Sequence, residues 1–446
     1  MILGAMVRIL ALFSHFMIIS LVILLSIIVL RQRISLLALS TLLFIILDSL
    51  GLLFLSCFDI RIFLPYLENY HLEQPLLENE FLLVRQLSAH WIFLILVSLA
   101  LIIELIIFQG QRKNHFATNS FSRTRILFCI IVLLFLGLLA YLRYFFFGPG
   151  FQALSVSRIM FKNTVEAVST RSAVSRLIQP GQGAYLASLA SYIIFPLISF
   201  LLVLCWGNNL AKLITIFMFG LSQMYAIQTV QKAPIVFHIV TYSMFLIFAY
   251  NSNEEVKIIN YIRKNIIKLV VLSLGVGSLS YTVMFGQNPV NAFLSTLGRL
   301  ILVPGNTESL WFFVFPDVLD YLGITFSINT NMKIIHNVAY YSTGNISSAN
   351  ASFIAVGWSG YGYLGVILAS SFFILYLLTV DYFMFSLSKK AQLLLAASIF
   401  APLFFLVSGS IMDFLSKGGI ISFLGVIILK FSKNSVNHLR WVKNEH

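Results

Sequence analysis

The sequences GRLILVPGNTESLWFFVFPDVLDYLGI (298–324) and ISSANASFIAVGWSGYGYLGVILAS (346–370) bound the longest stretch of the chain outside its apolar runs. This stretch, Arg299 to Ala369, is rich in Trp, Phe, Tyr, Gly and Asn and poor in charge. Disordered connectors have the opposite composition, with few aromatic residues and a high net charge. We therefore expect a folded loop that lies against the membrane and leads into a glycine-interrupted helix.

The chain as a whole is far too apolar for a soluble protein. Of its 446 residues, 59% are hydrophobic and only 10% are charged, which excludes a soluble domain. A helix needs about 20 apolar residues to cross the hydrocarbon core. By this criterion the sequence predicts an all-α, polytopic integral membrane protein. We expect a single transmembrane domain over residues 1–446, with about eleven spans. They are 9–30, 34–57, 91–109, 126–147, 184–206, 210–229, 234–250, 265–285, 355–380, 391–411 and 414–431.

The basic residues predict the orientation, because short cytoplasmic loops retain positive charge. When Arg31 and Arg33 are placed inside, most of the 29 Lys and Arg residues fall on inner connections or on the C-terminal tail. The N-terminus is then outside and the C-terminus inside. The net charge of +13 is explained by this topology, so we expect no nucleic-acid partner. The three cysteines lie in or beside apolar runs and predict neither a disulfide nor a metal site.

This topology leaves outer segments at about 58–90, 148–183 and 286–354, of which the last two are large loops expected to hold short interfacial or re-entrant helices. The second is unusually basic for an outer loop, so its charge has a purpose other than topology. One interpretation is an amphipathic helix attracted to anionic headgroups. The other is a phosphate-binding surface, because guanidinium groups match phosphate oxygens. Its charged residues are Arg158, Lys162, Glu166, Arg171 and Arg176.

The last outer loop contains signs of a re-entrant element. The sequence VPG after Arg299 predicts a tight turn, and Pro316 interrupts the aromatic run WFFVFP, which favours a re-entrant or interfacial helix. Non-helical backbone at that depth persists only where it lines a protein-buried or watery cavity. The proton acceptors available there and in the basic loop are His336, Asp317, Asp320, Glu308 and Glu166.

Polar residues within the apolar runs are costly in hydrocarbon and are functional candidates by default. A relay through Asp48 and Glu104 would favour a transporter. The glycine cluster GWSGYGYLG (357–365) favours close helix packing over direct substrate contact. The polar residues concerned are Asp48, Glu104, Arg143, His238 and Asp381.

Two parts of the sequence resemble one family. An arginine ahead of a proline–glycine turn, an aromatic stretch with Asp317 and Tyr321, and SANASFIAVGWSGYGYLGVILAS (348–370) resemble the late outer loop and following helix of bacterial O-antigen polymerases, the oligosaccharide repeat-unit polymerases. The basic loop together with RLIQPGQGAYLASLASYIIFPL (176–197) resembles the first large outer loop of the same family and its exit helix. The resemblance covers about residues 148–369.

The resemblance implies a glycosyltransferase at the outer face of the bacterial cytoplasmic (inner) membrane. Such an enzyme joins undecaprenyl-diphosphate-linked oligosaccharide units into O-antigen, capsule or exopolysaccharide and uses neither metal nor soluble cofactor. Its expected partners are the membrane lipids, and a chain-length regulator protein is a possible further partner. Fixed arginines would offset the charge of the leaving diphosphate. The expected substrate-binding residues are Arg158, Arg171, Arg176 and Arg299, and the expected catalytic residues are His336, Asp317 and Asp320.

Two alternatives remain open. An O-antigen ligase-type transferase would use the same donor but transfer the glycan to the lipid A core. A transporter or flippase of lipid-linked sugars would keep its charge in a central membrane cavity. The cations of this chain cluster in outer loops, which favours a transferase.

Overall fold

The computed structural model describes residues 2–57, 80–109, 122–157, 164–178, 183–206, 208–229, 232–250, 286–323, 352–403 and 409–432, with a few isolated positions between them. Every regular element in these ranges is helical. The all-α prediction is therefore confirmed for the described part of the chain.

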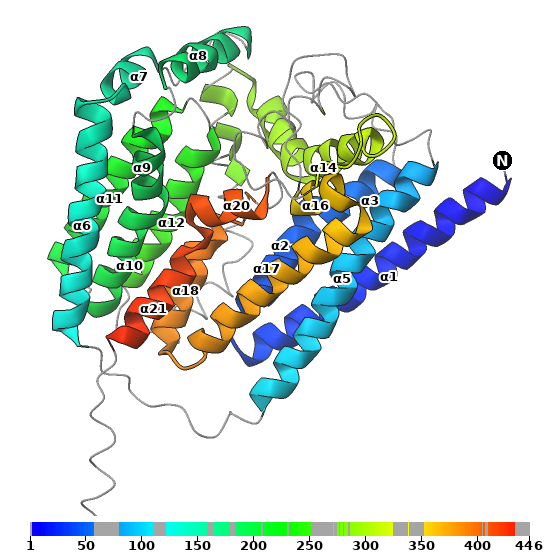
Figure 1. Ribbon diagram of the computed structural model, residues 1–446, viewed down its shortest axis with the longest axis horizontal. Coiled ribbons are helices and arrows are strands. Elements are labelled where there is room, and N and C mark those ends of the chain that lie inside the picture. The colour runs from blue at the N-terminus through cyan, green and yellow to red at the C-terminus, as the bar shows by residue number, and fades with distance from the viewer. Residues whose placement is uncertain are drawn as a thin grey trace, which may run out of the picture.

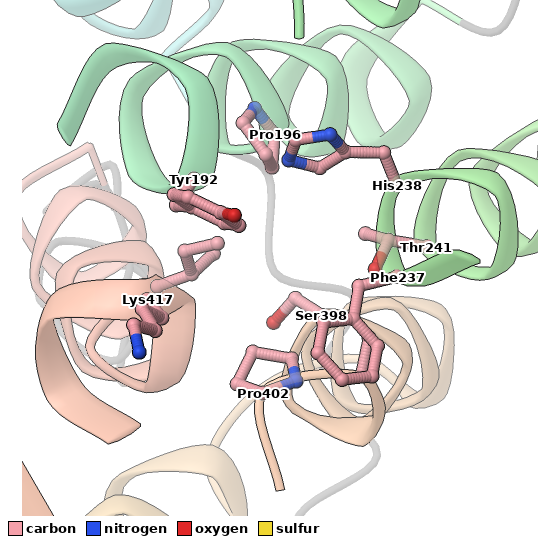
Figure 2. Close-up of a pocket in the computed structure, with 10 residues that line it drawn as sticks. Tyr192, Pro196, Phe237, His238, Thr241, Ser398, Pro402 and Lys417 are labelled. Carbon is pink, nitrogen blue, oxygen red and sulfur yellow. The ribbon is translucent and has the colours of Figure 1, made fainter. Parts of the chain in front are cut away.

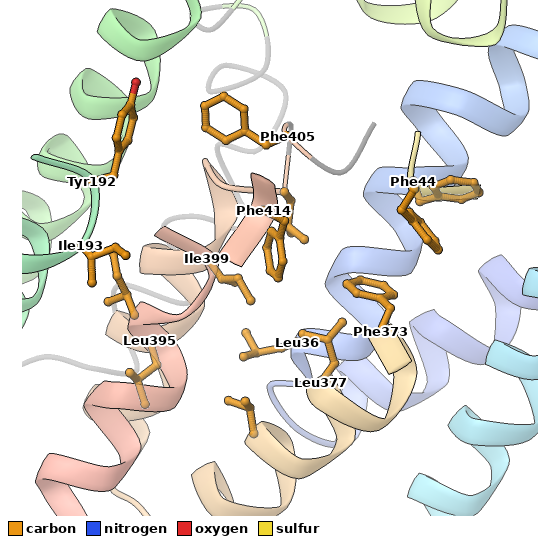
Figure 3. Close-up of a cluster of buried hydrophobic side chains, with 14 of the residues drawn as sticks. Leu36, Phe44, Tyr192, Ile193, Phe373, Leu377, Leu395, Ile399, Phe405 and Phe414 are labelled. Atoms are coloured by element: carbon orange, nitrogen blue, oxygen red, sulfur yellow. The ribbon is translucent and has the colours of Figure 1, made fainter. Parts of the chain in front are cut away.

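The helices form two groups that lie side by side in Figure 1. The first group contains α1 (Ile2–Gln32), α2 (Leu36–Phe44), η1 (Ile45–Ser49), α3 (Leu50–Cys57), α5 (Glu80–Gln109), α14 (Pro289–Val314), α16 (Phe353–Tyr361) and α17 (Tyr363–Met384). The second contains α6 (Arg123–Phe146), α7 (Gly150–Val156), α8 (Thr164–Leu177), α9 (Ala184–Leu189), η4 (Ala190–Ile194), α10 (Phe195–Cys205), α11 (Asn209–Gln228), α12 (Lys232–Tyr250), α18 (Lys389–Phe400), α20 (Ile411–Phe414), η5 (Leu415–Gly419) and α21 (Ile421–Phe431). One apolar core joins the groups, and Figure 3 follows it from Tyr192 through Phe414 to Phe44.

Seven helices are long and apolar enough to cross a membrane, and the pair Ile411–Gly419 and Ile421–Phe431, bent by 52°, makes an eighth if it counts as one span. The described residues thus support a polytopic membrane protein but do not confirm eleven spans. Two expected spans, 234–250 and 391–411, correspond to the shorter apolar helices Pro234–Ile247 and Lys390–Ile399. The expected span 265–285 lies largely outside the described residues.

The third span begins about ten residues earlier than its apolar run suggests. The sequence predicts a span over 91–109, with an outer segment up to residue 90, whereas α5 runs from Glu80 to Gln109. The polar residues Arg85, Gln86 and His90 give this part of the sequence the composition of a loop. In the structure each is hydrogen-bonded to a neighbouring element, so the helix can continue through them.

The predicted turn at VPG is wrong, because α14 continues through Pro304 to Val314. A proline inside a helix removes one backbone hydrogen bond. In a membrane protein the helix can still continue, because neighbouring helices can satisfy the freed backbone group. The adjacent Gly305 serves a close crossing with α3: a Cβ atom on it would lie 2.9 Å from the backbone nitrogen of Leu52. A Cβ atom on Gly51 would likewise overlap the carbonyl oxygen of Ile301. Small residues let the two backbones approach.

The expected span 355–380 is in fact two helices that form a hairpin. α16 ends at Tyr361, and Gly362 turns the chain with a φ of +59°, a value that favours glycine. A Cβ atom on Gly365 would overlap the carbonyl oxygen of Gly357, so the two helices touch at their glycines. The close-packing interpretation of the glycine cluster is thereby confirmed. At nine residues, α16 is about 14 Å long and cannot span a membrane.

The predicted inner and outer connections lie at opposite ends of the described structure. The short helices α7 and α8 lie at the same end as α14 and α16 (Figure 1). The opposite end carries the α1–α2 turn, the start of α6, the α17–α18 turn and the end of α21 (Figure 1), where Arg31, Arg123, Lys390 and Lys430 are found. The expected inner connections therefore lie together at one end, away from α7 and α8 (Figure 1), and the side of a membrane that this end faces stays a prediction.

Candidate functional site

Three ionisable side chains from different elements meet inside the first group of helices. Asp48 comes from η1, His90 from α5 and Glu308 from α14, and each is fully buried. One potential ligand atom from each residue lies within 4.8 Å of the other two. We call these residues the Asp48–His90–Glu308 cluster. Buried carboxylates are rare unless they are paired or bind a cation, so the cluster is the main candidate site.

Glu308 is the most strongly held member of the cluster. Its Oε2 atom lies 2.7 Å from Nε2 of His90 and accepts a hydrogen bond of 3.0 Å from the Gln86 amide. Its Oε1 atom accepts a 2.5 Å hydrogen bond from the Ser352 hydroxyl. Ser309 in turn donates to the Gln86 oxygen at 2.8 Å. Such a network fixes the position of the carboxylate.

The helix that follows Ser352 also acts on Glu308. Ser352 is the N-cap residue of α16. Its side chain makes no capping hydrogen bond, and its hydroxyl donates to Glu308. The N-terminus of α16 is therefore next to the carboxylate. The partial positive charge of a helix N-terminus stabilises a nearby anion.

Asp48 is held quite differently. Neither of its carboxylate oxygens accepts a hydrogen bond from any residue that the structure describes, and both are buried. It lies in η1, a π-helical turn within a span, and such turns are frequent at functional sites. Next to the cluster, the His15 ring lies edge-on to His90 with 5.8 Å between centroids. Within the described ranges both His15 ring nitrogens also lack a hydrogen-bond partner.

A second buried polar group lies at the other end of the same helices. Asp381 accepts hydrogen bonds from the Leu36 and Leu37 amides at 2.8 and 3.0 Å and from the Ser35 hydroxyl at 3.0 Å. It thus caps α2 from a different helix. Glu104 pairs with Arg33 and accepts a hydrogen bond from Ser35. These contacts join the α1–α2 turn to α5 and α17, which indicates a structural role.

An aromatic layer separates the two buried polar groups. Phe44, Phe93, Phe353 and Phe373 are almost fully buried. Their ring centroids lie 4.7 Å apart for Phe44 and Phe93, 5.2 Å for Phe93 and Phe353, and 5.3 Å for Phe353 and Phe373. Along α5, His90 and Glu104 are about 21 Å apart, and Phe93 follows His90 by one turn. Asp48 and Glu104 therefore belong to different sites.

The chain after α14 closes over α16. Arg85 forms a 2.8 Å ion pair with Asp317 and donates to the Phe312 carbonyl at 3.2 Å. The Trp358 indole donates to the Phe315 carbonyl at 2.9 Å. The Gly323 amide donates to the Gly360 carbonyl at 3.0 Å. Residues 315–323 are thereby fixed against α16, on the Arg85 side of the cluster.

Most of the site residues expected from the sequence lie elsewhere. Asp317 is 59% exposed and bonded to Arg85, and Asp320 is exposed. Arg176 is exposed on α8, over the second group of helices (Figure 1). Arg299 is exposed on α14 and lies within the helix, not at a helix end beside a turn.

The remaining expected residues cannot be placed. Arg158 and His336 lie outside the described residues, and the Arg171 side chain does too, although its backbone belongs to α8. The described residues therefore neither bring the seven expected site residues together nor exclude such a grouping.

Sequence reasoning identified two members of the cluster but not the third. Asp48 was identified as an acid within an apolar run, and Glu308 as one of several proton acceptors. His90 was missed because it was assigned to the end of an outer segment. The available signal was its spacing, four residues after Gln86, which places both side chains on one face of a helix.

A small cavity lies in the second group of helices (Figure 2). Its volume is about 10 Å³, and Tyr192, His238, Ser398 and Lys417 are among its lining residues. Lys417 also forms an ion pair of 3.3 Å with Asp413. A cavity of this size holds one water molecule at most. As described, it is too small for a sugar or a lipid headgroup.

No family model matches the sequence, and no curated protein or solved structure matches the chain. A function must therefore be inferred from the residues of the chain and their geometry. Two carboxylates and an imidazole in a dry site can accept a proton, share one or bind a cation.

Proposed function

We propose that the chain is a membrane glycosyltransferase that polymerises oligosaccharide repeat units carried on undecaprenyl diphosphate, at the outer face of the bacterial cytoplasmic membrane. One observation carries the proposal. The stretch that resembles repeat-unit polymerases folds into α14 and the α16–α17 hairpin, and these elements supply Glu308 and Ser352 to the buried Asp48–His90–Glu308 cluster. Residues that resemble a family of transferases thus surround a proton-accepting site.

The proposed reaction transfers a glycan between two lipid-linked molecules. A sugar hydroxyl of the acceptor attacks the anomeric carbon of the donor glycan, and the bond from that carbon to the lipid diphosphate breaks. The hydroxyl proton passes to a carboxylate of the cluster, and the diphosphate leaves with the electron pair of the broken bond. We assign the proton acceptor to Asp48, because its oxygens accept no hydrogen bond from the described residues.

The other members of the cluster have positioning roles in this proposal. Glu308 already accepts hydrogen bonds from Gln86 and Ser352, and its Oε2 atom lies 2.7 Å from Nε2 of His90, so its oxygens are less available to a substrate proton. It fixes His90 on α5 and Ser352 at the start of α16. Proton transfer to a positioned base typically contributes 10²–10⁴-fold to a rate, as an order of magnitude.

A transporter is the alternative from another class. It is favoured by the two buried ionisable groups in one set of helices, since relays of acids and histidines are typical of pumps. The aromatic layer argues against it. Phe44, Phe93, Phe353 and Phe373 separate the two groups, and Asp381 is occupied in capping α2. A continuous polar path would instead place hydroxyls or carboxylates at the level of these rings.

The direct test uses purified protein in liposomes supplied with a lipid-diphosphate-linked repeat unit. A ladder of glycan lengths on a gel, with stoichiometric release of lipid diphosphate, is the expected result. Asp48→Asn should lower the rate by about 100-fold or more, whereas the control Thr379→Ala, at an exposed hydroxyl on α17, should not. Equal rates for the Asp48 variant and the wild type would refute the assignment of Asp48.

Deletion of the gene in its host separates the three functional classes. Loss of a polymerase leaves single units attached to the final acceptor. Loss of a ligase leaves long unattached chains, and loss of a flippase leaves units trapped on the inner leaflet. Either of the last two results would overturn the polymerase proposal.

A further inference from the structure

The Asp48–His90–Glu308 cluster has an uncompensated charge. Two carboxylates lie together with every residue of the cluster fully buried, and both Asp48 oxygens lack a hydrogen-bond donor among the described residues. Burial of an isolated carboxylate is strongly unfavourable. The cluster itself contains no lysine or arginine, so a proton or a bound cation must provide the compensating positive charge.

His90 can supply a nitrogen ligand to such a cation. Nδ1 of His90 lies 3.1 Å from the Ser49 hydroxyl. Two tautomers fit these contacts. In one, Nε2–H donates to Oε2 of Glu308, 2.7 Å away; in the other, Nδ1–H donates to Ser49 and Nε2 has a lone pair for an ion. In the second tautomer the lone pairs of Nε2 and Oε2 repel each other, and a positive centre beside both atoms removes that repulsion. Histidine ligands of metals commonly donate their other N–H to such a partner, which fixes the tautomer and the ring.

We propose that Asp48, His90 and Glu308 bind one divalent cation of the class that prefers mixed oxygen and nitrogen ligands, such as Zn²⁺ or Mn²⁺. Each residue offers one ligand atom, and the three atoms lie within 4.8 Å of one another. Such ligand atoms can surround an ion after small side-chain movements. Gln86 and Ser352 donate hydrogen bonds to the Glu308 carboxylate, as neighbouring residues do to the ligands of metal sites.

Three protein ligands leave a coordination position for water or for a substrate oxygen. If the centre acts on a lipid diphosphate as proposed above, the ion supplies the positive charge that the cluster lacks. An Asp48 carboxylate that ligates through one oxygen retains the other as a proton acceptor. This proposal departs from the metal-independent chemistry that the family resemblance implies, but the metal site itself depends only on the described geometry.

The test measures metal binding directly. Purified protein is stripped with a chelator, reloaded with ZnCl₂ or MnCl₂, desalted and analysed by mass spectrometry of the elements. We expect about one ion per wild-type chain and a higher unfolding temperature in the loaded protein, because an ion that binds only the folded state stabilises it. Asp48→Asn should retain less than about a tenth of an ion, whereas Asp320→Asn should bind like the wild type.

The wild-type protein alone decides the question if the Asp48 variant fails to fold. Absence of bound metal after reloading, with no shift in unfolding temperature, overturns the inference, and so does equal binding by a folded Asp48→Asn protein. Polymer formation by protein that binds no ion on reloading overturns the metal site while leaving the proposed function intact. One tightly bound ion in a protein that makes no polymer would support the metal site and overturn the proposed function.

Discussion

Removal of the Asp381 carboxylate should destabilise the protein more than most single substitutions. Asp381 lies on α17, yet two of its hydrogen bonds come from the first amides of α2, Leu36 and Leu37. Both of these residues are fully buried, so water cannot replace the lost acceptor. In Asp381→Ala the two amides remain without a partner. The Ser35 hydroxyl keeps its hydrogen bond to Glu104 and adds little to the loss.

The magnitude follows from the number of amides that lose their partner. A buried donor without an acceptor costs about 1–3 kcal/mol, so two amides give a loss of about 2–6 kcal/mol. Asp381→Asn retains one carbonyl oxygen and can accept from one amide, which predicts a loss of about 1–3 kcal/mol. Thr379→Ala is the matched control on the same helix. Its hydroxyl is exposed and bonds only within its own turn, so its effect should stay within about 0.5 kcal/mol.

The free energy of unfolding can be measured by titrating the detergent-solubilised protein with SDS and following far-UV circular dichroism. The expected order of stability is Thr379→Ala, then Asp381→Asn, then Asp381→Ala. If Asp381→Ala unfolds at the same SDS fraction as the control, the capping of α2 by α17 contributes nothing to stability and the reasoning fails.

Three further predictions concern the hairpin, the surface ion pair and the orientation. Gly365→Leu should prevent the α16–α17 hairpin from closing and yield aggregated protein in size-exclusion chromatography. The control Gly220→Leu should elute normally, because a Cβ atom at this position meets nothing within 4 Å. Normal elution of both variants would contradict the packing argument. Asp317→Asn removes a partly exposed ion pair, which is worth about 0–1 kcal/mol, so a much larger fall in thermal stability would show that the pair matters more than its exposure suggests. In intact cells an impermeant thiol reagent should label Ser169→Cys but not Ser388→Cys, and the reverse pattern would invert the topology.

The sequence allows most long helices to be predicted, because apolar length reflects the thickness of the bilayer. It does not reveal where an apolar run turns back on itself. Residues 355–380 form one run in the sequence, and only the contact between Gly357 and Gly365 divides it into α16 and α17. The same holds at Pro304, where the sequence predicts a turn and the close approach of α3 and α14 accompanies a continuous helix. Tertiary contacts override the local signal in both cases.

At the candidate site, too, the sequence reveals features that depend on neighbouring residues but not contacts between residues distant in sequence. Asp48 can be recognised from its own surroundings, because a charge within an apolar run is costly. Its neighbours cannot, since Glu308 and His90 are distant in sequence and no periodicity connects them. His90 was also hidden by a misplaced helix boundary, and boundaries are the least reliable part of a sequence-based prediction. The contact among these residues exists only in the folded structure.

The shortness of α16 has a consequence for how the protein is made. A segment of nine residues is too short to be recognised as a span during insertion, which needs about 20 apolar residues. Its buried surface contacts α14 and α5, synthesised earlier, and α17, synthesised later. It can reach its final place only after α17 has entered the bilayer. The Ser352–Glu308 hydrogen bond therefore forms after α17 is in place, and the helices that carry Asp48, His90 and Glu308 are synthesised before it.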